Sequence, residues 1–150
     1  MAAIAEDLLR RSADELDELF ADSPPGPIPT GIGRGTAIVA PGTKAAKPLA
    51  ELAKMLAWQG KSFDGDRHDL VNLLSPLSLR AVRAQAYEAE SWLDGKPCIV
   101  LDYSKSSFLA RPVRDEIRLI GVGEYLGIVF VGKQRAPVRF HLAFPPAAAR

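Results

Sequence analysis

The chain has 150 residues, of which 47% are hydrophobic and 25% charged, as in an ordinary globular domain. Its 19 Lys and Arg residues balance 18 Asp and Glu residues, which argues against a nucleic-acid-binding surface, since such surfaces need a basic excess. A single cysteine, Cys98, excludes an intrachain disulfide, and no apolar run approaches the ~18 residues that span a bilayer. We therefore expect a cytoplasmic domain without integral membrane association.

Residues 1–22 have the pattern of an amphipathic helix. Ser12 and Glu15 have the spacing of a capping box, which predicts that the helix bends or restarts near Ser12. Prolines and glycines in residues 23–32 predict a stiff linker that ends the helix. We expect the helix to be an arm or a lid. Its apolar residues at helical spacing are Ile4, Leu8, Leu16, Leu19 and Phe20.

The glycine-rich segment Gly31–Gly35 precedes the β-branched run Thr36–Val39. Its GxGxG spacing occurs in phosphate-binding loops, but such a loop follows a strand and opens a helix. Here the glycines follow a proline-rich linker, so we expect them to ease the tight start of a strand. Thr43 and Pro48 then predict a second short helix after this strand. Its apolar face consists of Leu49, Leu52, Met55 and Leu56.

From Trp58 onward, short apolar runs recur about every ten residues with turn residues between them. Together with Thr36–Val39 they predict about eight antiparallel strands, enough to close a calycin-like β-barrel around one ligand. The predicted barrel domain occupies residues 33–145, and residues 146–150 form a tail. The runs are Trp58–Phe63, Asp69–Leu74, Leu79–Ala89, Cys98–Tyr103, Val113–Ile120, Tyr125–Val131 and Val138–Phe144.

One of these runs, Leu79–Ala89, is full of strong helix formers. Propensity alone predicts a helix, whereas its place in a series of hairpins predicts a strand. We predict a strand, because a helix here would remove one wall of the barrel.

The last strand alternates between an apolar face and a face with Arg139 and His141. In a sandwich the second face meets solvent and His141 is exposed. In a barrel that encloses a ligand, one face packs against helices and the other lines the cavity, so His141 can point into the lumen. Both readings of His141 stay open. His68 and His141 are far apart and lack the spacing of metal ligands, so we expect no metal and no cofactor; haem binding through His141 is a remote alternative.

A second candidate group centres on Asp102, which ends an apolar run and is costly to bury without a cation. Arg111, Arg114 and Arg118 in the next segment supply cations. One interpretation is an acid–arginine cluster near the barrel mouth. The other is a set of exposed cross-strand ion pairs, each worth under about 1 kcal/mol.

Several short motifs resemble small actinobacterial-type proteins and, more distantly, the GXWXG/DUF4334 group. That group is similar in turn to calycin barrels such as lipocalins and fatty-acid-binding proteins. A clear GxWxG is missing from this chain. The resemblance implies a barrel with an internal pocket for a lipid or other apolar molecule, and it assigns no catalytic residue. The motifs are Trp58–Phe63 (WQGKSF), Leu79–Val82 (LRAV), Asp115–Arg118 (DEIR) and Tyr125–Gly127 (YLG).

We therefore predict a protein that binds a lipid or other amphiphilic small molecule, with an inward arginine pairing with its carboxylate. The alternative is a cofactor-independent isomerase, cyclase or dehydratase with an acid–base pair among Asp102, Tyr103 and His141. A partner-binding role for the acidic N-terminal helix is a further alternative, and the oligomeric state stays open. The predicted ligand-binding residues are Trp58, Arg83, Tyr87, Asp102, Tyr103, Arg118, Tyr125, Arg139 and His141.

Overall fold

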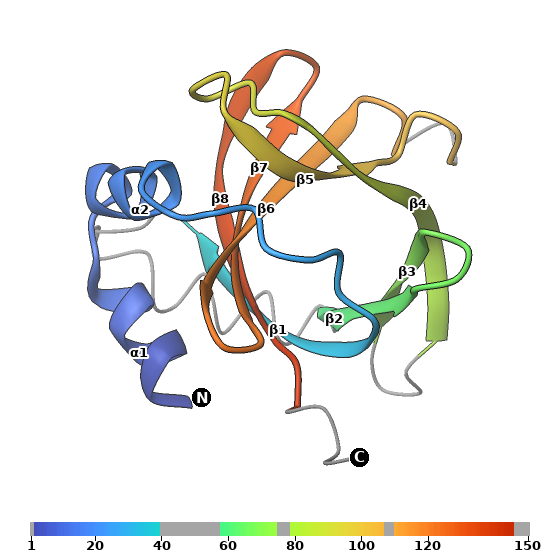
Figure 1. The fold of residues 1–150 in the computed structure, drawn as a ribbon, viewed down its shortest axis with the longest axis horizontal. Helices are drawn as coiled ribbons and strands as arrows, with labels where there is room; N and C mark the ends of the chain where they lie inside the picture. Colours follow the sequence, from blue (N-terminus) through green and yellow to red (C-terminus); the bar gives the residue numbers. More distant parts are fainter. Residues whose placement is uncertain (1, 40–57, 75–78, 107–109, 146–150) are drawn as a thin grey trace.

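The structure, a computed structural model, describes residues 2–39, 58–74, 79–106 and 110–145. Two helices, α1 (Ala2–Arg10) and α2 (Ala13–Ala21), precede the strands. Eight antiparallel strands then follow one another in sequence order around a closed barrel (Figure 1). They are β1 (Gly31–Val39), β2 (Trp58–Asp64), β3 (Asp69–Leu74), β4 (Leu79–Glu90), β5 (Pro97–Asp102), β6 (Val113–Gly121), β7 (Glu124–Val131) and β8 (Gln134–Ala143).

The predicted eight-stranded antiparallel barrel is confirmed, and β8 closes it by pairing with β1. The predicted N-terminal helix is two helices, and both of them precede β1. The predicted second helix, from Thr43 to Leu56, lies outside the described residues. Within the described ranges, no helix has the length and apolar character needed to cross a bilayer.

Residues 79–90 form the long strand β4, although many of them favour a helix. The first half of β4 pairs with β3 and the second half pairs with β5. Each half is therefore hydrogen-bonded to a neighbouring strand, and this pairing outweighs the local preference. Ala84 and Ala86 face the barrel interior, whereas Arg83 and Gln85 are exposed on the outside.

A capping box separates the two helices. The Glu15 amide donates to the Ser12 hydroxyl, and the Ser12 amide donates to the Glu15 carboxylate; both donor–acceptor distances are 3.1 Å. The predicted restart at Ser12 is confirmed. Because the box satisfies amide groups that would otherwise lack partners at the start of α2, the chain can begin a new helix in a new direction.

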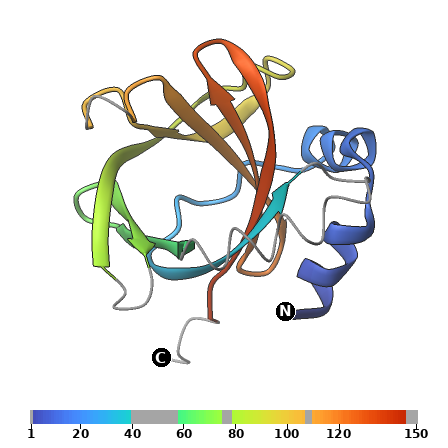
Figure 2. The same ribbon diagram turned by 180° about the vertical axis from the view of Figure 1, so that it is seen from behind.

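The helices bury one apolar face against the outer surface of the barrel (Figures 1 and 2). Leu8, Leu16 and Phe20 are buried there against outward-facing residues of β1, β5 and β7. We call this group the outer core. Its buried barrel residues are Ile38, Cys98, Val100, Leu126, Ile128 and Phe130.

The proline-rich linker crosses one end of the barrel on its way from α2 to β1 (Figure 1). The Leu119 amide donates to the Pro24 carbonyl at 2.9 Å, and the Tyr125 hydroxyl donates to the Pro27 carbonyl at 2.7 Å. Ile28 packs against the side chains of the barrel interior. The linker therefore covers this end of the barrel, while the helices lie on its wall.

Truncating Phe20 tests how firmly the helices are docked. Phe20→Ala removes a fully buried ring of the outer core, and we expect the free energy of unfolding to fall by about 3–5 kcal/mol in urea denaturation. Val122→Ala, at a position 93% exposed, should change it by less than about 0.5 kcal/mol. A loss below about 1 kcal/mol for Phe20→Ala would show that α2 does not pack on the barrel.

Candidate functional site

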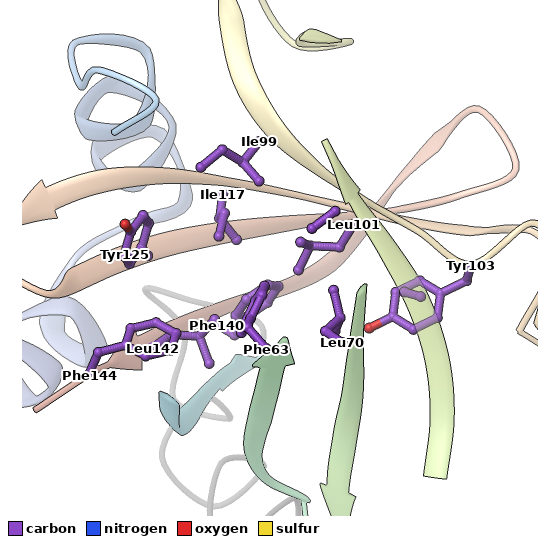
Figure 3. Packing of buried hydrophobic residues seen from close by; sticks show 12 residues of the cluster. Phe63, Leu70, Ile99, Leu101, Tyr103, Ile117, Tyr125, Phe140, Leu142 and Phe144 are labelled. Atoms are coloured by element: carbon purple, nitrogen blue, oxygen red, sulfur yellow. The ribbon is translucent and has the colours of Figure 1, made fainter. Parts of the chain in front are cut away.

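The side chains that face the barrel interior form one apolar cluster, which we call the interior cluster (Figure 3). Ile99 and Ile117 point into the interior, and Tyr125 lies beside Leu142, its partner on the neighbouring strand β8 (Figure 3). Phe140 is a further buried member. Trp58, Val113, Leu119 and Val129 are partly buried against the cluster. Its other buried members are Phe63, Leu70, Ala84, Ala86, Leu101, Tyr103 and Phe144.

Four buried polar side chains, Lys61, Asn72, Tyr103 and Asp115, hydrogen-bond to one another in this interior; we call them the interior polar cluster. The Lys61 ammonium donates to the Tyr103 oxygen at 2.6 Å and to Asn72 Oδ1 at 2.8 Å. It also lies 3.1 Å from Asp115 Oδ2. Asn72 Nδ2 donates to the Tyr103 oxygen at 3.0 Å. Lys61 and Asp115 are only 3% and 4% exposed, so this is a charge pair inside the barrel.

Aromatic rings surround the Lys61 ammonium. Its nitrogen lies 5.6 Å from the ring centre of Trp58, 5.3 Å from that of Tyr103 and 5.2 Å from that of Phe140. The Trp58 indole also donates to Asn72 Oδ1 at 3.1 Å. A Cβ at Gly35 would lie 2.4 Å from the Trp58 ring, so this glycine leaves the space that the indole occupies.

Strand alternation directs these polar side chains inward. Lys61 lies two residues before Phe63 on β2, and Asp115 lies two residues before Ile117 on β6; residues two apart share a face. Tyr103 directly follows β5, which pairs with β6. The polar groups therefore come from two pairs of neighbouring strands, β2–β3 and β5–β6, which the closed barrel brings face to face.

The charges of the interior polar cluster depend on its own contacts. Burial acts to lower the pKa of Lys61, but the Tyr103 oxygen and the Asp115 carboxylate beside the ammonium outweigh it and raise the pKa above its usual 10.5. Burial also raises the pKa of the Tyr103 hydroxyl, and the nearby Lys61 charge only partly opposes this. At neutral pH Lys61 is therefore charged and Tyr103 keeps its proton.

Three of the predicted ligand-binding residues face the interior. Tyr103 belongs to the interior polar cluster, and the Trp58 indole donates to Asn72 of the same cluster. Tyr125 packs in the interior cluster near the end that the linker covers. The structure therefore brings Trp58 and Tyr103 together and places Tyr125 apart from them.

Arg83, Tyr87 and Asp102 lie on the outside of the barrel. The Tyr87 hydroxyl donates to Asp102 Oδ2 at 2.7 Å, while Arg114 bonds instead to Glu116 at 3.0 Å. Asp102 also lies directly opposite Arg114 where β5 pairs with β6, and the positive charge of Arg114 acts on its carboxylate. The tyrosine contact therefore adds to this interaction on the outer surface of the barrel. Arg83 lines an open depression of about 400 Å³ on the outer surface of β2–β4. Because aspartates and arginines are mixed there, the depression has no dominant charge. It is lined by Ser62, Phe63, Asp64, Gly65, Arg67, Asp69, Val71 and Arg83.

Arg118 and Arg139 are buried, but they lie outside the barrel and hold other segments to it. Arg118 bonds to the Asp94 carboxylate at 2.7 and 2.8 Å and to the Phe20 carbonyl at 2.9 Å. Arg139 bonds to Asp17 of α2 at 2.8 and 3.0 Å. Alternation puts both on the strand face opposite the interior cluster. The buried cation that we find facing the interior in the described part of the chain is therefore Lys61, whereas the sequence predicted an arginine in this role.

The histidines and the cysteine lie apart from the interior polar cluster. His141 is buried on the outer face of β8, 2.7 Å from Glu124 Oε1, and His68 is exposed in the turn after β2. Burial raises the pKa of the Cys98 thiol to about 12, with the nearby Glu116 charge adding to the effect. Among the described residues, no group of three or more potential ligands is arranged to hold a metal ion.

Sequence reasoning missed Lys61, Asn72 and Asp115 as site residues. Asn72 and Asp115 are each a lone polar residue at alternating positions that are otherwise apolar, as Asp115 is between Val113 and Ile117. Such a residue either points into the barrel with its apolar neighbours or marks a break in the alternation of apolar and polar residues along the strand. Lys61 alternates with Gln59 as well as with Phe63, so its strand gives no such signal. Choosing the more apolar face of β3 and of β6 as the inner one would have identified Asn72 and Asp115, but not Lys61.

No family model matches the chain, and no curated protein matches it. One solved structure, a crystal structure of a protein from the actinobacterium Thermomonospora curvata, is similar, with a TM-score of 0.70 and 23% sequence identity. The match covers 96% of this chain and 95% of that one. At this identity the likeness shows the fold, an eight-stranded antiparallel barrel consistent with the calycin-like architecture.

A double-mutant cycle tests the buried charge pair. Lys61→Met leaves the Asp115 carboxylate buried without a cation, and we expect a loss of about 3–5 kcal/mol in the free energy of unfolding. Asp115→Leu should cost a similar amount. The double variant removes both charges, so its loss should be at least about 1 kcal/mol smaller than the sum of the single losses. Losses that add to within about 0.5 kcal/mol would contradict the pair.

Proposed function

We propose that the barrel interior binds a small apolar or amphiphilic molecule, with the polar end of that molecule at the interior polar cluster. The observation that carries the proposal is a closed barrel whose inward side chains are apolar except for one buried group of hydrogen-bonding residues. Binding sites for small molecules combine apolar walls with a few placed polar groups. Barrels of eight strands have an interior that side chains can fill or that can hold one small ligand.

The interior has a polar end and an apolar end. Asp115 lies near the start of β6, and Leu119 lies near its end, where the linker crosses. They are four positions apart along the strand, which is about 13 Å. Tyr125 and Ile28 also pack at the linker end. An elongated amphiphile would therefore lie with its tail toward the linker and its head at the interior polar cluster.

An acid–base enzyme is the second candidate, because Lys61, Tyr103 and Asp115 lie within hydrogen-bonding distance of one another. Acid–base catalysis is most effective when the pKa of the catalytic group is near the working pH. The pKa values of Lys61 and Tyr103 are instead raised above their usual 10.5 and 10.0. Both groups are therefore suited to donate hydrogen bonds rather than to exchange protons, which favours binding.

A pair of leucine substitutions on β4 tests where binding takes place. Ala84 faces the interior and its neighbour Gln85 is exposed outside. With Nile red, an uncharged apolar dye whose fluorescence rises out of water, we expect Ala84→Leu to weaken binding by at least about tenfold, or ~1.4 kcal/mol, because the added side chain takes up interior space.

Gln85→Leu adds the same side chain to the opposite face and should leave the affinity for Nile red unchanged. Circular dichroism establishes that both variants keep the barrel. Equal affinities of the two variants, or a greater loss for Gln85→Leu, would place the dye outside the barrel and contradict the proposal.

A further inference from the structure

We infer that the head group of the bound molecule is uncharged and that a hydroxyl suits it best; this inference rests on the proposed function. The ligand class is then a long-chain alcohol or another hydroxylated apolar molecule, in place of a fatty-acid anion. Three properties of the interior polar cluster lead to this class: its net charge, the hydrogen bonds already made by Lys61, and the contacts of Tyr103 and Asp115.

The first property is charge balance. Lys61 and Asp115 lie 3.1 Å apart and neutralise each other, and they are the ionised side chains that we find facing the interior in the described part of the chain. A carboxylate placed here would meet the Asp115 charge as well as the Lys61 charge, and an ammonium group would meet the same conflict in reverse. A buried charge without its own partner is costly, so an uncharged head group is favoured.

The second property is that Lys61 already uses its hydrogen-bonding capacity. An ammonium group has three N–H donors. Three acceptors surround Lys61 Nζ at 2.6 to 3.1 Å: the Tyr103 oxygen, Asn72 Oδ1 and Asp115 Oδ2. A ligand that needed Lys61 as its donor would have to displace one of these contacts. Lys61 therefore holds the cluster together instead of binding the ligand.

The third property is the loosely held proton of Tyr103. Its acceptor, Asp115 Oδ2, is 3.4 Å from the hydroxyl oxygen, beyond the ~2.5–3.0 Å usual for O–H···O bonds. A ligand oxygen can take this proton at a shorter distance. Both contacts of Asp115 with Lys61 and Tyr103 are made by Oδ2, so within the described residues Oδ1 keeps lone pairs for a ligand donor. A hydroxyl accepts from Tyr103 and donates to Asp115, whereas an ester or ketone only accepts.

Three probes with the same alkyl chain test the inference: decanol, decanoate and decylamine, each used to displace Nile red at neutral pH. On the wild-type protein, decanol should displace the dye at a concentration at least about tenfold lower than either charged probe. Asp115→Asn leaves the Lys61 charge uncompensated and should shift the preference toward decanoate by at least about tenfold. Lys61→Met should shift it toward decylamine by a similar factor.

Glu18→Gln is the matched control, because it removes an exposed carboxylate from α2, outside the barrel; the ranking of the three probes should not change. A wild-type preference for decanoate, or equal displacement by all three probes, overturns the inference and leaves the proposed function standing. If neither Nile red nor any probe binds the wild-type protein, the proposed function fails and the inference fails with it. Should circular dichroism show that a charge variant is unfolded, the wild-type ranking alone decides.

Discussion

The charge pair between Lys61 and Asp115 is the interaction on which the interior of this barrel depends. Burying each charge alone would cost several kcal/mol, so the two are stable there only as partners with further hydrogen bonds. Tyr103 and Asn72 supply those bonds from neighbouring strands. The four groups come from β2, β3, the end of β5 and β6. Their hydrogen bonds can form only when these strands bring the four side chains together inside the barrel. The same groups form the polar end of the barrel interior.

The outer surface of the sheet uses charge in a different way. Arg118 bonds to the Phe20 carbonyl and Arg139 bonds to Asp17, so arginines on β6 and β8 anchor α2 to the barrel. These outer arginines are already paired within the protein and face away from the interior cluster. Arg118 and Arg139, two of the arginines that the sequence predicted to face inward, therefore do not face the interior of the barrel. The two faces of the sheet therefore differ: the outer face holds α2 through paired arginines, and the inner face combines apolar side chains with the interior polar cluster.

The strand pattern predicted the barrel well, because regular apolar runs with turns between them leave few other arrangements. It also predicted the capping box at Ser12, which depends on residues only three apart. The interior face was harder to choose, since Arg114–Arg118 carries charges on both faces of β6: Arg114 and Arg118 point outward, while Asp115 points inward. Most of these charges lie on the outward face, so the charge pattern of the sequence did not indicate the inward one. The inward one held a single acid among apolar residues, and its partner Lys61 is distant in sequence, so only the closed sheet reveals the pair.

The ionisation of Lys61 is the most direct measure of this account. Carbon NMR of protein labelled at the lysine side chains, with the Lys61 signal assigned by its loss in Lys61→Met, follows that group through an alkaline titration. Because Asp115 and Tyr103 raise the pKa of Lys61 above 10.5 despite burial, the account predicts that the ammonium keeps its proton up to that pH, after exposed lysines have begun to titrate. A midpoint well below 10.5 would show that burial outweighs the effect of Asp115 and Tyr103, and would contradict the close contact of the ammonium with both groups.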